Sequence, residues 1–184
     1  MSEARLSMGV SAAGASKPAQ PKHFSVITRS GEVKHVDFNA VTARLEPLGE
    51  GLNHNFVSID KVAQKTIIGI TDGMPTSEID ELASRVAADM ATQHPDYNLL
   101  AGRVSASNLQ KTCPSSFVEA ARKLHAGDIL ADDLYEFILA NANVINASIE
   151  HANDMVFDVF AMKTMARSYL LRVDKVLVET PQYM

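Results

Sequence analysis

Apolar and polar residues follow two different periods along this chain. Residues 24–38 contain two short apolar-rich stretches on either side of Arg29-Ser30-Gly31-Glu32, where the glycine can take the positive φ that a tight hairpin needs. The pattern therefore predicts a β-hairpin. Because an isolated two-stranded hairpin is only marginally stable in water, we expect this one to pack against the helices that follow.

Four segments with helical spacing come after the hairpin. Asn39 and Ser58 are residue types that cap helices, and we expect them to begin the first two; Asp72-Gly73-Met74-Pro75 breaks the chain before the third. The apolar positions of the four segments are Val41, Leu45 and Leu48; Ile59, Val62, Ala63, Ile67 and Ile70; Ile79, Leu82, Ala83, Val86, Ala87 and Met90; and Tyr97, Leu100, Ala101 and Val104. This order predicts a mainly α fold, a small four-helix bundle capped by a β-hairpin or small sheet.

A boundary is expected at Thr112-Cys113-Pro114, after which the pattern is less regular. Helical spacing predicts three more helices, over residues 115–125, 128–140 and 161–169. Ser115 is the expected cap of the first of these, and Asp174-Lys175 separates two apolar stretches as a second hairpin. These two strands have no obvious sheet to join, so we expect residues 113–184 to be an incomplete, mostly helical part of a larger domain.

The first 21 residues are rich in Ala and Ser and nearly lack large apolar side chains. Such a segment cannot offset the entropy lost on ordering, so we expect residues 1–21 to be a disordered tail. It has no contiguous hydrophobic run, which excludes a secretory signal; an organellar transit peptide is the alternative.

The composition of the chain argues against several classes of function. The net charge of −5 over 184 residues disfavours binding to nucleic-acid phosphates. No apolar run approaches the roughly 20 residues of a membrane span, so we expect a cytoplasmic protein without membrane contact. Cys113 is the only cysteine, which excludes an internal disulfide and a cysteine-based zinc site. The six histidines show no paired helical spacing, so no metal site is expected.

The predicted hairpin turn is one candidate site for an anion. Arg29 and Lys34 supply cations there, and the backbone N–H groups around Gly31 are exposed. A solvated β-turn is the plain structural alternative. The turn lies where helix ends are expected, and helix N-termini readily bind phosphate.

The ends of the third and fourth helices offer further candidates. Ser77-x-x-Asp80 matches a capping box, which leaves Thr76 and Asp80 available to face a ligand at the helix N-terminus. Lys111, at the end of the fourth helix, either complements the helix dipole or approaches an anion beside the hairpin.

Several motifs in fixed order extend this interpretation. They are Val26-Ile27-Thr28-Arg29-Ser30-Gly31, Phe38, Gly51-Leu52-Asn53, Thr76-x-x-x-Asp80, His94-Pro95-Asp96-Tyr97 and Ser107-Asn108-Leu109-x-Lys111. Together they resemble the ATP-cone, the regulatory domain at the N-terminus of the large subunit of class I ribonucleotide reductase. Residues 160–171 and 181–184 resemble the start of that enzyme's catalytic domain.

The resemblance implies a fold and a ligand. An ATP-cone over residues 22–112 would precede the incomplete N-terminal part of the catalytic domain, residues 113–184. It would bind ATP as activator or dATP as inhibitor, with Mg²⁺. Arg29 and Lys111 would meet phosphates, and Asp80 the base or sugar. The implied nucleotide-binding residues are Thr28, Arg29, Gly31, Lys34, His35, Val36, Asp37, Phe38, Asn39, Ala40, Thr76, Asp80 and Lys111.

Two positions depart from the family's pattern. The family usually has lysine where this chain has Thr28 and Ala40. Each missing cation weakens phosphate binding by roughly 1 kcal/mol if it was engaged. Lys34 stands where an acidic residue is common and compensates in part.

The resemblance also implies partners and leaves three functions open. Ribonucleotide reduction in this family needs a radical cysteine and a reducing cysteine pair, which a chain with Cys113 alone lacks. The implied partners are the rest of the large subunit, the small radical-generating subunit and further copies in a homo-oligomer. The chain is then the allosteric front end of the reductase, a stand-alone nucleotide sensor, or a helical interaction protein with a decayed nucleotide site.

Overall fold

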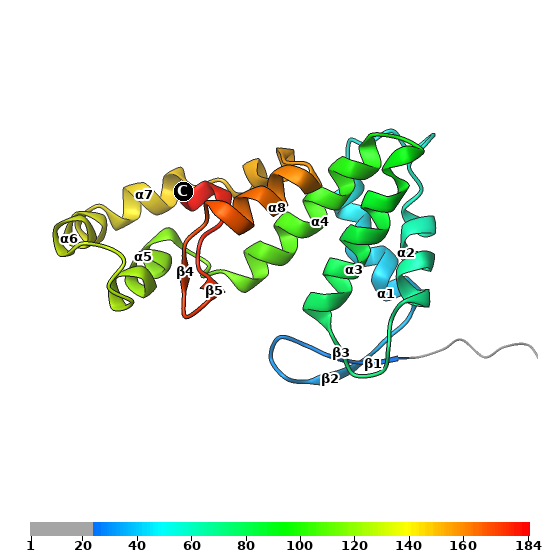
Figure 1. The fold of residues 1–184 in the computed structure, drawn as a ribbon, viewed down its shortest axis with the longest axis horizontal. Coiled ribbons are helices and arrows are strands. Elements are labelled where there is room, and N and C mark those ends of the chain that lie inside the picture. Colours follow the sequence, from blue (N-terminus) through cyan, green and yellow to red (C-terminus); the bar gives the residue numbers. More distant parts are fainter. Residues whose placement is uncertain (1–23) are drawn as a thin grey trace, which may run out of the picture.

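The computed structural model describes residues 24–184, and the expected tail, residues 1–21, lies outside them. As predicted, the described chain is mainly helical with a small sheet (Figure 1). The elements are β1 (Phe24–Ile27), β2 (Val33–Val36), α1 (Phe38–Leu45), α2 (Ile59–Ile68), β3 (Met74–Pro75), α3 (Thr76–Asp89), α4 (Asp96–Thr112), α5 (Phe117–Ala126), α6 (Asp132–Ala140), α7 (Ala142–Ser148), α8 (Val159–Ser168), β4 (Arg172–Val173) and β5 (Val176–Leu177).

The first two strands form the predicted hairpin, and a third strand joins them. β1 and β2 pair antiparallel, with Val26 opposite Lys34, and Gly31 in the turn has a φ of 84°. β3 pairs parallel with the other edge of β1. Asp72 prepares this contact because its Oδ1 accepts a hydrogen bond of 2.9 Å from the Ser25 N–H. The segment predicted only to break the chain therefore extends the sheet.

The start of α1 differs from the prediction. Asp37, and not Asn39, is the N-cap: its Oδ1 accepts a hydrogen bond of 2.9 Å from the Ala40 N–H, while Asn39 already lies inside the helix. A short 3₁₀ turn, Glu46–Gly49, follows directly after Leu45. Asp37 competes better because its own backbone is extended, as a cap requires.

Other helix starts test the remaining capping predictions. Ser58 caps α2 as predicted, accepting from the Lys61 N–H at 3.3 Å. The capping box at Ser77 is wrong, because α3 already begins at Thr76 after Pro75 and has no side-chain cap. Ser116, one residue later than predicted, caps α5. Asp80 therefore lies within α3, is buried and has no capping role.

The first core lies among α1, α2, α3, α4 and the sheet. Most of the apolar side chains predicted from helical spacing are buried in it, with Val62, Ala63, Leu100, Ala101 and Val104 fully buried. The core also contains Leu52, Val57 and Val159, which helical spacing did not predict. The phenol of Tyr97 also belongs to this core, and its Oη accepts a hydrogen bond of 2.9 Å from the Ser58 N–H. This hydrogen bond joins the start of α2 to α4.

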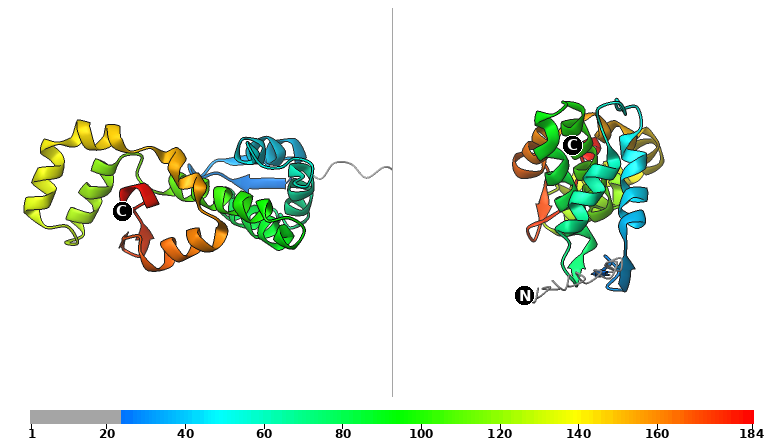
Figure 2. Two further views of the ribbon diagram at one scale, coloured as in Figure 1. Left: turned by 90° about the horizontal axis from the view of Figure 1, so that it is seen from above. Right: turned by 90° about the vertical axis from the view of Figure 1, so that its right-hand side faces the viewer.

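The later helices extend away from this core. α8 packs along α4, whereas α5, α6 and α7 form an arc at the far end (Figures 1 and 2). The helix predicted over 128–140 begins later, at Asp132, because Asp128 takes a positive φ of 55°. Within α6 Ile138 is buried, while Leu134 and Phe137 are 48% and 60% exposed.

The second hairpin forms as predicted. β4 and β5 pair antiparallel, and the turn residues Asp174 and Lys175 have φ values of 49° and 68°. Within residues 24–184, no helix is both long enough and apolar enough to cross a membrane.

Cys113 is buried at the end of α4 and should react slowly with thiol reagents. Its Sγ donates to the Glu179 carbonyl at 3.2 Å, and burial, aided by the nearby Glu179 carboxylate, raises the pKa of the thiol to about 11. Because the thiolate is the nucleophile, we expect little alkylation by iodoacetamide at pH 8 in the folded protein and rapid alkylation in denaturant. Equal rates in both states would contradict this placement.

Candidate functional site

A cavity of about 550 Å³ opens between the hairpin, α1, the start of α3 and the end of α4. Seven of the residues that the resemblance implied line it: Thr28, Arg29, Val36, Ala40, Thr76, Asp80 and Lys111. These residues lie far apart in the sequence, and the fold gathers them because the hairpin turn crosses the ends of both helices. The volume is in the usual range for a small-molecule pocket.

The other six implied residues do not line the cavity: Gly31, Lys34, His35, Asp37, Phe38 and Asn39. Lys34 pairs instead with Glu32 in the turn, at 3.1 Å between Nζ and Oε2, with both side chains 62% exposed. Asp37 caps α1 and so shapes the helix start. His35 precedes the lining residue Val36 on β2, and successive strand residues point to opposite faces.

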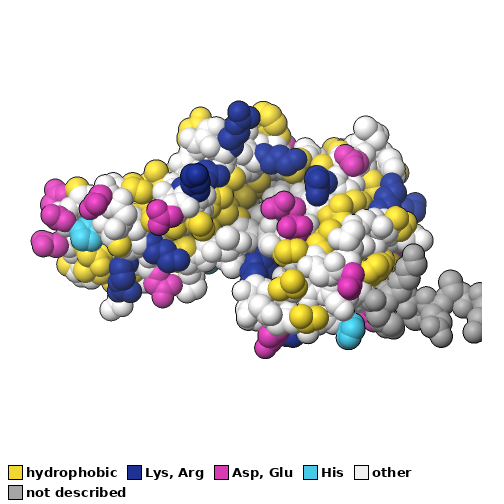
Figure 3. All heavy atoms as spheres, turned by 60° about the horizontal axis from the view of Figure 1, so that its bottom comes forward, with side chains coloured by type: hydrophobic (Ala, Val, Ile, Leu, Met, Phe, Trp, Pro, Cys, Tyr) yellow, Lys and Arg dark blue, Asp and Glu magenta, His cyan; other side chains and the backbone are white. Residues whose placement is uncertain are grey.

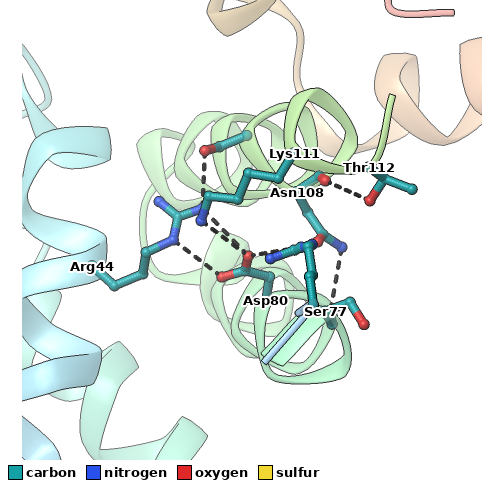
Figure 4. A network of polar contacts seen from close by, with 8 residues as sticks. Arg44, Ser77, Asp80, Asn108, Lys111 and Thr112 are labelled. Carbon is teal, nitrogen blue, oxygen red and sulfur yellow. Dashed lines mark hydrogen bonds and ion pairs between the residues drawn. The ribbon is translucent and has the colours of Figure 1, made fainter. Parts of the chain in front are cut away.

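Asp80 is the centre of the cavity's charge. Its carboxylate is 8% exposed and lies 3.6 Å from Arg29 Nη2, 3.3 Å from Arg44 Nε and 3.5 Å from Lys111 Nζ (Figure 4). One carboxylate cannot neutralise three cations, so these four groups carry a net charge of two positive units. In a partly enclosed cavity such an excess favours a multiply charged anion.

Arg29 is held in place from α4. Its Nη2 donates to the Oδ1 of Asn108, and the Nδ2 of Asn108 donates in turn to the Ser77 carbonyl at 3.3 Å. The chain of contacts links the hairpin to α4 and α3. The guanidinium is thereby oriented toward the cavity.

Arg44 is the charged residue that sequence reasoning missed. It lines the cavity from α1, one turn after Ala40, and its Nη2 donates to Ser107 Oγ at 2.9 Å. The signal available in the sequence was its i+4 spacing from Ala40, which places both side chains on the same helix face. Its partners Asp80 and Ser107 are distant in sequence.

Lys111 has a lowered pKa. Burial is the main cause, and the Arg44 and Arg29 cations add to it, while Asp80 opposes the shift. An anion in the cavity would counter these effects and favour the charged ammonium.

The rest of the cavity wall is mostly apolar. The lining residues not implied by the resemblance are Ser30, Val41, Arg44, Leu45, Ile79 and Ala83. A cavity with cations on one side and aliphatic side chains on the other fits a ligand with a charged end and a flat apolar end.

The cavity does not fit a magnesium ion held by protein carboxylates. Asp80 is the only carboxylate in its lining, and three cations surround it. Residues 24–184 contain no cluster of three His, Cys, Asp or Glu side chains that could hold a metal. Mg²⁺ usually takes its ligands from substrate phosphates and water.

A second cavity of about 400 Å³ lies on another side of the molecule, between α3, α4, α8 and β5. Its charged lining residues are Glu81, Arg85 and Lys163. Figure 3 shows apolar surface between the two ends of the molecule with basic side chains beside it. The implied nucleotide-binding residues are absent from this lining, so the first cavity is the better candidate.

A cavity with excess positive charge, covered by a hairpin and bounded by helix ends, is suited to bind an anion. The sequence comparison adds a domain class: residues 24–112 match the ATP cone domain.

The chain is also homologous to a particular enzyme subunit. It is 40% identical over 168 residues to the ribonucleoside-diphosphate reductase large subunit of Arabidopsis thaliana and 39% identical over 168 residues to that of Caenorhabditis elegans. It is 36% identical over 179 residues to the large subunit of Dictyostelium discoideum. These matches cover 86%, 86% and 91% of this chain and 21% of each relative, so the chain spans about a fifth of their length.

Proposed function

We propose that this chain is the N-terminal allosteric part of a ribonucleoside-diphosphate reductase large subunit, and that its cavity binds ATP as activator or dATP as inhibitor. The observation that carries this proposal is the excess of cations around Asp80 in the cavity of an ATP cone domain. In this proposal α1, α2, α3 and α4 are the four-helix bundle of the cone, and the three-stranded sheet is its cap.

The contacts support a role for each wall of the cavity. Arg29 and Lys111 would meet the phosphates, because they reach the cavity from the hairpin turn and the end of α4 with side chains 31% and 40% exposed. Thr76 lies in the first turn of α3, where backbone N–H groups and the helix dipole also favour an anion. The aliphatic wall would receive the base, and Asp80 the sugar. Mg²⁺ would bind through the phosphates.

The cavity remains positively charged although Thr28 and Ala40 stand where the family usually has lysine. Thr28 and Ala40 both line it without a cation, but Arg44 supplies one from the turn of α1 that follows Ala40. Lys34 forms an ion pair with Glu32 and does not line the cavity. We infer that Arg44, rather than Lys34, compensates for the missing lysines.

The wider assignment also belongs to this proposal. The matches run over 168 residues or more and thus extend beyond the cone, which favours a reductase subunit over a stand-alone sensor. Residues 113–184 would begin the catalytic domain. The partners would be the rest of the large subunit, the small radical-generating subunit and further copies in a homo-oligomer, in the cytoplasm.

Isothermal titration of the full chain with ATP and with dATP tests the proposal directly. We expect saturable binding of both nucleotides near a ratio of one per chain, with a rise in Tm on adding either. The absence of both heat and a Tm shift with either nucleotide would refute the proposed function.

Replacing Asp80 by asparagine should reduce the discrimination between ATP and dATP more than it weakens ATP binding. If the carboxylate senses the sugar hydroxyl, the ratio of the two dissociation constants should move toward one by roughly threefold to tenfold. Asp89→Asn, on the exposed end of the same helix, is the matched control. An equal loss for both nucleotides would argue against this role of Asp80.

A further inference from the structure

We propose that Arg44 is a positioning residue that orients Asp80 toward the sugar of the bound nucleotide; this inference rests on the proposed function. Arg44 lies on α1, Asp80 on α3 and its other partner Ser107 on α4. The guanidinium therefore joins three helices at the carboxylate on which discrimination depends.

The three cations around Asp80 are not equivalent. Arg29 comes from the hairpin turn and Lys111 from the last turn of α4, and in the proposed complex both would turn to the phosphates, Arg29 giving up its contact with Asn108. Arg44 differs because its Nε is buried beside Asp80 and its Nη2 donates to Ser107 Oγ at 2.9 Å. Figure 4 shows it reaching Asp80 from α1, while Lys111 and Asn108 extend from α4.

Phosphate binding would redistribute these contacts. Once Arg29 and Lys111 turn to the phosphates, Arg44 is the remaining partner of the buried carboxylate among the described residues. A buried carboxylate without a partner is unfavourable, so the pair with Arg44 would then fix the position of Asp80. The position of both carboxylate oxygens relative to the sugar would follow from this one guanidinium.

An unused donor on Arg44 supports this change of contacts. Its Nε lies 3.3 Å from Asp80 Oδ1 but is buried and makes no aligned hydrogen bond, while its Nη2 is 3.4 Å from Oδ2. Both nitrogens thus already face the two oxygens. A small rotation of the carboxylate gives the two parallel hydrogen bonds that arginine forms with carboxylates.

Lysine cannot reproduce this arrangement. A single ammonium is a point charge, whereas the guanidinium presents a planar fork that contacts Asp80 and Ser107 at once. The substitution Arg44→Lys therefore separates two contributions. It keeps the positive charge of the cavity and removes the geometry that orients the carboxylate.

The test measures ATP and dATP dissociation constants by isothermal titration for the full chain and four variants: Arg44→Lys, Arg44→Gln, Ser107→Ala and the control Arg85→Gln. Arg85 is an exposed residue of α3 outside the nucleotide cavity. We expect Arg44→Lys and Ser107→Ala to keep ATP affinity within about threefold while the dATP-to-ATP ratio moves toward one by about threefold or more. Arg44→Gln should lose affinity as well, and Arg85→Gln should match the wild type.

Combining each substitution with Asp80→Asn shows whether Arg44 acts through that carboxylate. If it does, Arg44→Lys should change the ratio in the wild type and leave it unchanged in Asp80→Asn. An unchanged ratio in Arg44→Lys and Ser107→Ala, or equal changes in both backgrounds, would overturn the inference while leaving the proposed function intact. Failure of the wild type to bind either nucleotide would instead overturn the proposed function, and this inference with it. Ser107→Ala keeps the test valid if Arg44 variants fold poorly.

Discussion

Replacing Arg29 by alanine is expected to weaken ATP and dATP binding alike, by about 10- to 100-fold, because hydrogen bonds to charged groups contribute about 1.5–3 kcal/mol. Arg29 contacts Asp80 and Asn108 and would turn to the phosphates, which the two nucleotides share. The ratio of the two dissociation constants should therefore stay close to its wild-type value. Isothermal titration measures both constants.

The same substitution should cost little stability. Arg29 is partly exposed, and ion pairs of this kind contribute about 0–1 kcal/mol. Arg122→Ala, which removes an exposed arginine from α5, is the matched control and should bind both nucleotides as the wild type does. Selective loss of one nucleotide by Arg29→Ala would place Arg29 at the sugar or base instead of the phosphates.

Gly102→Ala should destabilise the protein by about 2–4 kcal/mol, the second large effect we expect. A Cβ atom at Gly102 would lie 2.1 Å from the Phe157 carbonyl oxygen and 2.6 Å from the Asp158 carbonyl carbon. Alanine alone favours an α-helix over glycine by about 1 kcal/mol. The clash is with backbone atoms that cannot rotate away, so it outweighs that gain.

Urea unfolding measures the change, and Gly69→Ala provides the comparison. A Cβ at Gly69 would meet the end of the Leu82 side chain at 2.9 Å, and a flexible side chain can shift at low cost. We expect that variant to lose less stability than Gly102→Ala. Hydrogen exchange in Gly102→Ala should increase first in residues 150–170. Wild-type stability in Gly102→Ala would show that α4 and the Phe157 backbone separate easily.

Much of the fold could be predicted because helical period is a local signal. The apolar positions of the third helix place Ile79, Ala83 and Ala87 on one side, and all three are buried. Strand β3 could not be predicted in this way. Met74–Pro75 is a two-residue strand inside a turn-forming run, and it exists because β1 offers a free edge and Asp72 binds the Ser25 N–H.

The residues of the candidate site that belong to recognisable motifs could be predicted from the sequence. The residue that joins the site only through contacts with distant parts of the chain could not. The motifs led to Arg29, Asp80 and Lys111, which the fold brings together. Arg44 carries no comparable signal, since its partners lie 36 and 63 positions away and only the folded chain brings these side chains of α1, α3 and α4 together. The prediction of the N-cap residue was also wrong where two nearby polar residues could each cap the helix, as at Asp37 and Asn39.

Helix α4 runs unbroken from Asp96 to Thr112, a length of about 25 Å at 1.5 Å per residue. One of its faces carries Lys111 at the first cavity and Asn108 against Arg29, and another carries Gly102 against the backbone before α8. No hinge separates the two. Because the helix is unbroken, it would tilt as a rigid body. A tilt of a few degrees at one end would move the other end directly, without a series of side-chain rearrangements between them.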